Sequence, residues 1–247
     1  MSESRSSAVQ GAIKSSDDVR EMFDGIVPRY DLLNRLMTGG RDIAWRRIAV
    51  REAARHLNPA AASVLDIATG TGDLALELER ARFASVVGLD FSKPMLQEAE
   101  RKAREEPGGG SLVSWVQGDA MALPFAADTF DAVTVGFGLR NMPDYLGALR
   151  EVVRVLKPGG TFVCLETSPL PSPVLRSIFE LTMQTGLPLL GGILSGDRAA
   201  YAYLPRSSAL FPDAESLGRL MQVAGLRNVR YLRRGLGAVA IHVGRKQ

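Results

Sequence analysis

The sequence predicts a doubly wound α/β fold, with seven strands in a mostly parallel sheet and helices on both faces. Two observations lead to this class. Short apolar runs alternate with amphipathic helical patterns between residues 61 and 166, which is the order of a parallel sheet with crossover helices. A glycine-rich turn also joins the first apolar run to the helix after it, as in folds that bind a nucleotide or a related cofactor.

The individual elements follow from these patterns. Strands are predicted at 63–68, 84–90, 112–117, 130–135, 161–166, 228–234 and 238–243, and helices at 74–82, 93–105, 144–156 and 214–224. The last two strands are joined at 235–237, where two glycines bracket a leucine. We therefore expect them to form an antiparallel hairpin that closes the sheet at its edge.

The N-terminal residues do not share this alternation. Residues 1–16 are polar and rich in serine, and we expect them to be disordered. Apolar residues at helical spacing over 17–60 predict a helical extension. The main domain is expected at 61–247, and its stretch 169–213 departs from the βα order as an insertion.

Composition excludes several classes of function. The chain has 247 residues and a net charge of +3, and its basic residues do not gather in one stripe, so nucleic-acid binding is not expected. One cysteine and two histidines are too few for a disulfide or a Cys/His zinc site, so no metal is expected. No signal peptide or transmembrane run is predicted, which makes the cytoplasm the default location.

The glycine-rich turn is the first candidate binding element. Gly70, Gly72 and Ala75 satisfy the pattern G-x-G-x-x-A directly after the strand that contains Asp66. Asp90 ends the next strand, where a carboxylate can accept hydrogen bonds from ribose hydroxyls. The pattern alone fits NAD(P), S-adenosylmethionine or a purely structural turn.

The charges around the turn favour S-adenosylmethionine. Asp66 and Asp73 flank the glycines, and no lysine or arginine lies nearby in the sequence. Two carboxylates would repel a pyrophosphate, whereas S-adenosylmethionine carries a sulfonium and an ammonium and has no phosphate. We therefore predict S-adenosylmethionine as the cofactor.

The end of the third strand adds groups that suit an adenine. Asp119 can accept a hydrogen bond from the exocyclic amine, and the backbone N–H of Ala120 can donate to a ring nitrogen. Phe91 and Met95 could pack on the adenine faces, although core packing explains them equally well. The predicted cofactor-binding residues are Asp66, Gly70, Thr71, Gly72, Asp90, Phe91, Met95, Asp119, Ala120 and Gly136.

Several segments resemble known methyltransferases. The chain resembles class I methyltransferases in four segments, 66–73, 88–96, 122–125 and 154–160. The features in these segments are widely shared in that class and imply a Rossmann-like fold. Other segments are specific to a smaller group, because they resemble the quinone-biosynthesis C-methyltransferases, and chiefly the menaquinone-pathway members. These segments are 29–34, 45–46, 136–141, 201–204, 211–213 and 237–242. This resemblance implies that a methyl group moves from S-adenosylmethionine to a ring carbon of a lipidic quinol, demethylmenaquinol.

Other functions stay open beside this one. A benzoquinol of the ubiquinone pathway or another lipidic phenol is the alternative acceptor. An amine methyltransferase more often has Asn or Asp followed by Pro-Pro and an aromatic residue after the fourth strand, where this chain has Gly-Phe-Gly-Leu-Arg-Asn. A non-catalytic regulatory module would bind the cofactor tightly and show no turnover with any quinol.

The resemblance also suggests catalytic residues. Arg140 could hold a quinolate oxygen electrostatically and Asn141 could hold it by a hydrogen bond. The alternative is that these two residues cap a helix and pair with neighbouring carboxylates. His242, Tyr201 and Tyr203 are candidates for the group that takes the quinol proton, although a lone histidine in an apolar strand is more often a core residue.

Two further segments are expected to control access of the cofactor and the lipidic substrate to the site. The extension at 17–60 is expected to fold over the cofactor as a lid, or else to be an ordinary ion-paired helix start. The apolar residues 174–194 are expected to line a groove for the prenyl tail or to rest on the membrane, with a buried core helix as the alternative. Peripheral contact with the inner face of the cell membrane and a homodimer are both left open.

Overall fold

The computed structural model describes most of the chain. The described residues are 38–106, 111–170 and 210–247, together with Val27, Asp31, Leu32, Asn34, Arg35, Ser207 and Ser208. The expectations for 1–16, for Tyr201 and Tyr203, and for the apolar residues 174–194 therefore lie outside the described residues.

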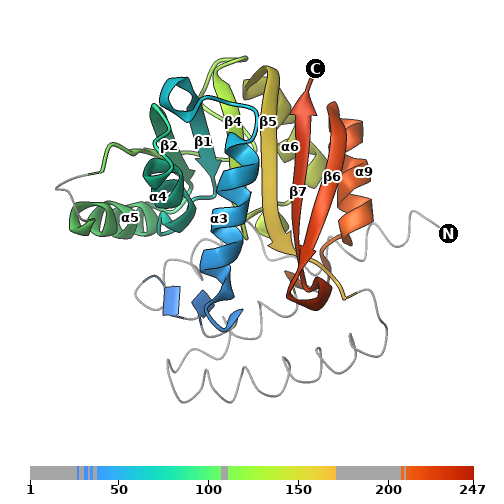
Figure 1. The fold of residues 1–247 in the computed structure, drawn as a ribbon, viewed down its shortest axis with the longest axis horizontal. Coiled ribbons are helices and arrows are strands. Elements are labelled where there is room, and N and C mark those ends of the chain that lie inside the picture. Colours follow the sequence, from blue (N-terminus) through green and yellow to red (C-terminus); the bar gives the residue numbers. More distant parts are fainter. Residues whose placement is uncertain are drawn as a thin grey trace.

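The described strands form one seven-stranded sheet in the order β3-β2-β1-β4-β5-β7-β6 (Figure 1). These are β1 (Ser63–Ile67), β2 (Ser85–Asp90), β3 (Ser114–Gln117), β4 (Phe130–Gly136), β5 (Leu156–Thr167), β6 (Leu226–Arg234) and β7 (Val239–Lys246). β1 to β5 pair in parallel, and β7 runs antiparallel to both of its neighbours. The predicted doubly wound fold with an antiparallel closing hairpin is confirmed.

The helices cover both faces of this sheet (Figure 1). They are α3 (Arg41–Ala54), α4 (Asp73–Arg80), α5 (Lys93–Glu105), α6 (Tyr145–Val155) and α9 (Ala214–Ala224). One core joins α3 and α4 to side chains such as Val64 and Ile241, and the other joins α6 and α9 to side chains such as Leu65 and Cys164. Neighbouring strand residues face opposite cores because side chains alternate along a strand.

Most boundaries agree with the predicted elements, and the fifth strand shows the main difference. β5 begins at Leu156, earlier than predicted, because Leu156 already pairs with Phe130 of β4. A register shift then follows between Phe130 and Ala132. The residues Lys157–Gly160 look like a turn in the sequence, and they form an irregular first part of the strand instead.

The order of the strands determines where a ligand belongs. β1 and β4 are neighbours, and the connection after β1 leads to β2 on one side, whereas the connection after β4 leads to β5 on the other side. In open α/β sheets the ligand sits outside the carboxyl ends at this point. The glycine-rich turn directly follows β1, and it therefore lies at the expected position.

Candidate functional site

The glycine-rich turn has a backbone that favours glycine. Gly70 and Gly72 have φ angles of 55° and 82°, in the left-handed region that side chains disfavour. Gly72 also lies against the indole of Trp115, where an added Cβ would be 2.6 Å from Cη2. Close packing against Trp115 is thus a reason for this glycine that is independent of any ligand.

Two backbone N–H groups hold the Asp90 carboxylate beside the turn by hydrogen bonds. Its carboxylate accepts hydrogen bonds from the Gly70 N–H at 2.7 Å and from the Ser92 N–H at 2.9 Å. These contacts join the end of β2 to the turn after β1. A carboxylate has four lone-pair positions, so these two bonds leave it able to accept from ligand hydroxyls as well.

Asp66 lies at 1% exposure beneath the same turn. Its carboxylate accepts from the hydroxyls of Thr69 at 2.6 Å and Thr134 at 2.7 Å. Burial raises the pKa of Asp66 to about 6, although the two hydroxyls act in the opposite direction, and nearby Asp90 adds to the rise. A buried carboxylate with a raised pKa gains from a bound cation, so the site fits S-adenosylmethionine better than a pyrophosphate.

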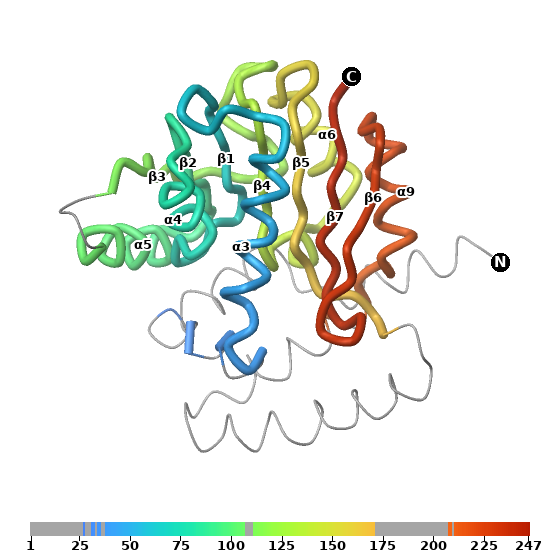
Figure 2. Tube along the Cα trace, in the orientation of Figure 1, coloured from blue at the N-terminus to red at the C-terminus, as the bar shows by residue number. Residues whose placement is uncertain are grey.

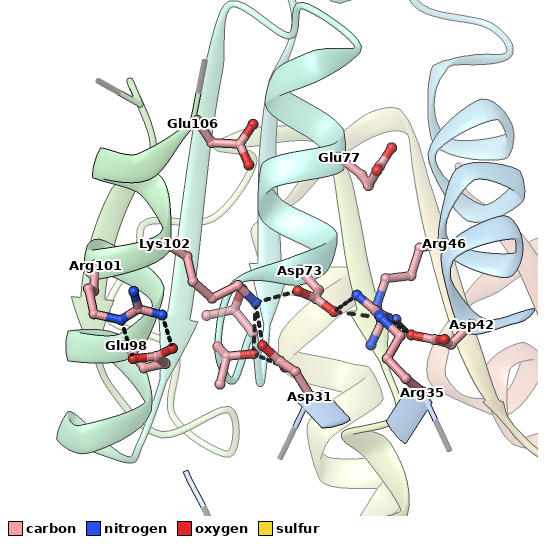
Figure 3. A network of polar contacts seen from close by, with 12 residues as sticks. Asp31, Arg35, Asp42, Arg46, Asp73, Glu77, Glu98, Arg101, Lys102 and Glu106 are labelled. Carbon is pink, nitrogen blue, oxygen red and sulfur yellow. Dashed lines mark hydrogen bonds and ion pairs between the residues drawn. The ribbon is translucent and has the colours of Figure 1, made fainter. Parts of the chain in front are cut away.

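Asp73, at the start of α4, is neutralised by cations from three other segments (Figure 3). Lys102 of α5 pairs with one carboxylate oxygen. Arg35 and Arg46 lie 2.9 Å and 3.5 Å from the other. Burial acts to raise the pKa of Asp73, but the Arg46 and Lys102 charges outweigh it and lower the pKa.

Asp73 is the residue at which the structure of this turn differs from the expectation. The expectation that no lysine or arginine lies near the turn is wrong, because the fold brings three of them to Asp73. Asp73 therefore presents no uncompensated negative charge to a ligand. The preference for a cationic cofactor rests on Asp66 and Asp90, whose carboxylates accept hydrogen bonds from hydroxyl and backbone N–H groups. The Arg46 charge also acts on Asp66, but it does not outweigh the effect of burial on the Asp66 pKa.

Residues of the N-terminal extension also reach the turn. Asp31 accepts a hydrogen bond from the Thr71 hydroxyl at 2.6 Å and pairs with Lys102 at 2.7 Å (Figure 3). Arg35 pairs with Asp42 of α3 as well as with Asp73. The extension and the turn are therefore joined by charged contacts that periodicity alone could not reveal.

The end of β3 is tied to the end of β2. The side-chain amide of Gln117 donates to the Phe91 carbonyl at 3.1 Å, so the Asp119 region lies next to the residues after Asp90. Asp119 is exposed, and its carboxylate accepts from the Met121 N–H at 2.8 Å. Met95 is fully buried in the first turn of α5, which agrees with its alternative role in the core, while Phe91 is half-buried.

The segment after β4 packs directly on the glycine-rich turn. At Gly138 an added Cβ would lie 2.5 Å from the Cβ of Ala68, so glycine permits this close approach. Gly136 ends the strand, and the short helix η2 (Leu139–Asn141) follows. The short helix that carries Arg140 and Asn141 thus begins directly after a residue that packs against the glycine-rich turn.

Arg140 forms a buried ion pair with Glu166. The Arg140 Nη1 lies 2.6 Å from the Glu166 carboxylate and donates to the Phe137 carbonyl at 2.8 Å. Glu166 also accepts from the backbone N–H groups of Arg140 at 3.3 Å and Thr167 at 2.8 Å. Glu166 is not among the residues predicted from the sequence, although an acid inside an apolar strand is a signal for it.

Of the proposed proton acceptors, the structure describes His242, which lies apart from this cluster. His242 is buried on β7, two strands from β4, and its Nε2 lies 2.8 Å from the Ala214 carbonyl at the start of α9. Burial lowers the pKa of His242, with the Ala214 contact acting in the opposite direction. The structure does not bring His242 to Arg140 and Asn141, and Tyr201 lies outside the described residues.

Comparisons with known proteins agree on one family. A family model described as the ubiE/COQ5 methyltransferase family matches residues 11–246. A protein of Thermus thermophilus named demethylmenaquinone methyltransferase is 50% identical over 90% of this chain and 99% of its own length. A Desulfotalea psychrophila protein named ubiquinone/menaquinone biosynthesis C-methyltransferase UbiE is 45% identical over 92% and 90%.

A solved structure supports the fold. A SAM-dependent methyltransferase from Thermotoga maritima has a TM-score of 0.61 to this chain at 20% sequence identity. The similarity covers 92% of this chain and 99% of that one. At this identity the likeness concerns the architecture alone.

Proposed function

Because the chain belongs to the ubiE/COQ5 methyltransferase family, we propose that it methylates a ring carbon of demethylmenaquinol in menaquinone biosynthesis. S-adenosylmethionine is the methyl donor. The observation that carries the proposal is the placement of the Arg140–Glu166 pair and Asn141 against a glycine-rich turn with two carboxylates, Asp66 and Asp90. A cation site and an oxyanion site thus lie side by side.

Each side of this site has a distinct electrostatic role. When bound, S-adenosylmethionine supplies an electrophilic methyl group on a positively charged sulfur. Asp66 and Asp90 favour that cation, and Asp90 also accepts from the ribose. Asp119 and the Ala120 N–H hold the adenine edge, with Phe91 beside the ring, while Gly70, Thr71, Gly72 and Gly136 shape the backbone around the ligand.

Arg140 and Asn141 act on the acceptor. A quinol ring carbon becomes nucleophilic when the neighbouring hydroxyl loses its proton, so guanidinium and amide donors aimed at that oxygen favour the reactive form, although Glu166 offsets the net charge of Arg140. Glu166 and the Phe137 carbonyl hold the Arg140 guanidinium in place. A guanidinium stays protonated in proteins, so a different group must take the quinol proton.

We favour Tyr201 over His242 as the proton acceptor. His242 lies under α9 with a backbone partner, so its position favours a structural role. We expect His242→Gln to keep the pH profile of single-turnover methylation and Tyr201→Phe to change it. An altered profile in the His242 variant alone would reverse this assignment.

The reaction itself is tested with purified protein, labelled S-adenosylmethionine and short-chain demethylmenaquinol. We expect label in the product when the quinol is kept reduced, and none with the oxidised quinone, because only the quinol can form the nucleophilic anion. A demethylated ubiquinone-pathway benzoquinol serves as the second acceptor, since one relative is named for both pathways. Absence of label with every quinol, in protein that binds the cofactor, would contradict the proposal.

The charged network supports the N-terminal extension as a lid. Lys102 joins Asp31 of the extension to Asp73, next to the glycines. Lys102→Met is expected to weaken S-adenosylmethionine binding roughly threefold to tenfold, because the lid loses a partly buried ion-pair link. Arg101→Met on the same helix is the control, since Arg101 forms its ion pairs within the helix, with Glu98 and Glu105. Equal affinities in a calorimetric titration would exclude this role.

Access for a lipidic acceptor completes the proposal. In the part of the chain that the structure describes, no helix has the length and apolar character needed to cross a membrane. We propose a cytoplasmic enzyme that meets its prenylated substrate at the inner face of the cell membrane. The apolar residues 174–194, which lie outside the described residues, are the proposed lining of the prenyl groove.

A further inference from the structure

The hairpin of β6 and β7 ends in an exposed leucine. Leu236 lies in the turn η3 (Gly235–Gly237) and is 86% exposed. Its φ of 58° is in the left-handed region, which glycine adopts at lower cost than leucine. An apolar side chain at this position therefore costs conformational energy without gaining burial in the folded chain.

The base of this turn is held firmly. The Ala238 N–H donates to the Gly235 carbonyl at 3.0 Å, and the Ser168 N–H donates to the Ala238 carbonyl at 2.8 Å. Gly235 lies against Trp45 of α3, where an added Cβ would be 3.3 Å from Cζ2. Leu236 is thus presented to solvent by a fixed support.

Two arginines, Arg233 and Arg234, directly precede the turn. β6 carries four arginines and no acidic residue: Arg227, Arg230, Arg233 and Arg234. Arg230 pairs with Glu52, whereas no carboxylate of the described residues forms an ion pair with the two arginines next to the turn. Arg233 stacks on Tyr231, with 5.6 Å from its guanidinium carbon to the ring centroid, and Arg234 donates to the Arg233 carbonyl at 2.8 Å.

The turn of the hairpin lies at the carboxyl ends of the parallel strands, which is also where the proposed active site lies. Val239, directly after the turn, pairs with Thr167 at the carboxyl end of β5, and β5 is parallel to β4 and β1. Figure 2 shows the turn at the edge where β5 ends and α3 begins. A surface that touched Leu236 would therefore also face this edge.

We propose that residues 233–237 dock the enzyme on an anionic lipid bilayer. Leu236 enters the boundary between headgroups and acyl chains, while Arg233 and Arg234 contact the negatively charged headgroups. The proposal deepens the function above, because a prenylated quinol resides in the bilayer and the docked edge is the one that carries Arg140 and Asn141. Binding to lipid is nevertheless independent of turnover and can be measured alone.

The test is co-sedimentation with phosphatidylcholine vesicles, with and without phosphatidylglycerol. Wild-type protein is expected to bind the anionic vesicles and to be released by salt. Leu236→Gly is expected to lower the partition coefficient about tenfold, the effect of losing one apolar side chain. This variant should fold at least as well as wild type, since glycine relieves the left-handed φ, and a thermal melt checks this point.

Matched substitutions away from the hairpin are the controls. Leu112→Gly removes a leucine with a similar exposed fraction. Leu112 precedes β3, which is the outermost strand on the side of the sheet away from the hairpin. Arg233→Gln with Arg234→Gln is compared with Arg101→Gln with Arg104→Gln on α5, so that both pairs change the net charge equally. We expect loss of vesicle binding only for the hairpin variants.

Three results would overturn the proposal. These are unchanged vesicle binding in Leu236→Gly, an equal loss in Leu112→Gly, or an effect of the hairpin variants on the oligomeric state instead of on lipid binding. The last result would make the hairpin a contact between copies of this chain. Methylation of a soluble short-chain quinol should persist in every variant, so failure of the enzymatic proposal is recognised separately.

Discussion

Asp66→Asn is expected to weaken S-adenosylmethionine binding roughly tenfold to a hundredfold at pH 7.5, which is the effect of removing a charged partner from a buried site. In the wild-type protein, affinity should fall as the pH drops below about 6, because protonation of Asp66 cancels its charge. The variant should lack this pH dependence. Isothermal titration calorimetry at several pH values, from about 5 to about 8, measures the loss of affinity and its pH dependence, because this range includes the pKa of Asp66.

The same carboxylate has the opposite effect on the stability of the protein without cofactor. The folded pKa of Asp66 lies above its ordinary value of 3.8, so the folded state binds the proton more tightly than the unfolded state. The free energy of unfolding should therefore fall as the pH rises from about 4 to about 6. At pH 7.5 Asp66→Asn should be more stable than wild type by roughly 1–3 kcal/mol.

Asp131 provides a control of opposite sign at the amino ends of the strands. Its carboxylate accepts from the Ser63 N–H at 2.9 Å and from Lys157 at 2.8 Å. Burial acts to raise its pKa, but these partners outweigh burial and lower it. Asp131→Asn should therefore lose stability at pH 7.5 and keep its cofactor affinity. A pH-independent affinity in wild type would contradict the role of Asp66.

Arg140→Met is expected to lower the free energy of unfolding by about 3–5 kcal/mol, because it leaves Glu166 charged and buried without its partner. Turnover should also fall, by roughly a hundredfold to a thousandfold, since the charge beside the quinolate oxygen is lost. Cofactor affinity should change little. Denaturant unfolding, single-turnover rates and titrations measure the three quantities.

The double variant Arg140→Met with Glu166→Gln separates structure from catalysis. Glutamine can still accept from the Thr167 N–H but carries no charge, so most of the lost stability should return. The turnover rate should stay low, because no positive charge is restored. If stability and turnover return together, Arg140 has only a structural role and the proposed oxyanion contact is wrong.

Local sequence patterns predict the elements of this fold well. The helix at 93–105 has the predicted bounds, with Ser92 as the cap whose hydroxyl accepts from the Met95 N–H at 3.2 Å. Asp90 is predicted at a strand end and is found there beside Gly70. These features depend on residues close together in the chain, for which periodicity and turn chemistry are direct physical signals.

Ion pairs in the site could not be predicted in this way. Lys102 reaches Asp73 from the far end of another helix, and Glu166 reaches Arg140 from the next strand. Spacing in the sequence carries no signal for such pairs. An ion pair of Arg140 with a neighbouring carboxylate was one of the alternatives predicted from the sequence, but Glu166 was not predicted as its partner.

By itself, the sequence determined the α/β class, the order of its elements, the glycine-rich turn and the positions of Asp66 and Asp90 around that turn. Each of these depends on local hydrophobic periodicity or on backbone conformation. Only the tertiary structure decided that Asp73 is neutralised, that Arg140 is held by Glu166, and that His242 lies beneath α9. These outcomes depend on which distant side chains the packed sheet and helices bring within a few ångströms, and the energy of a charge depends on those neighbours.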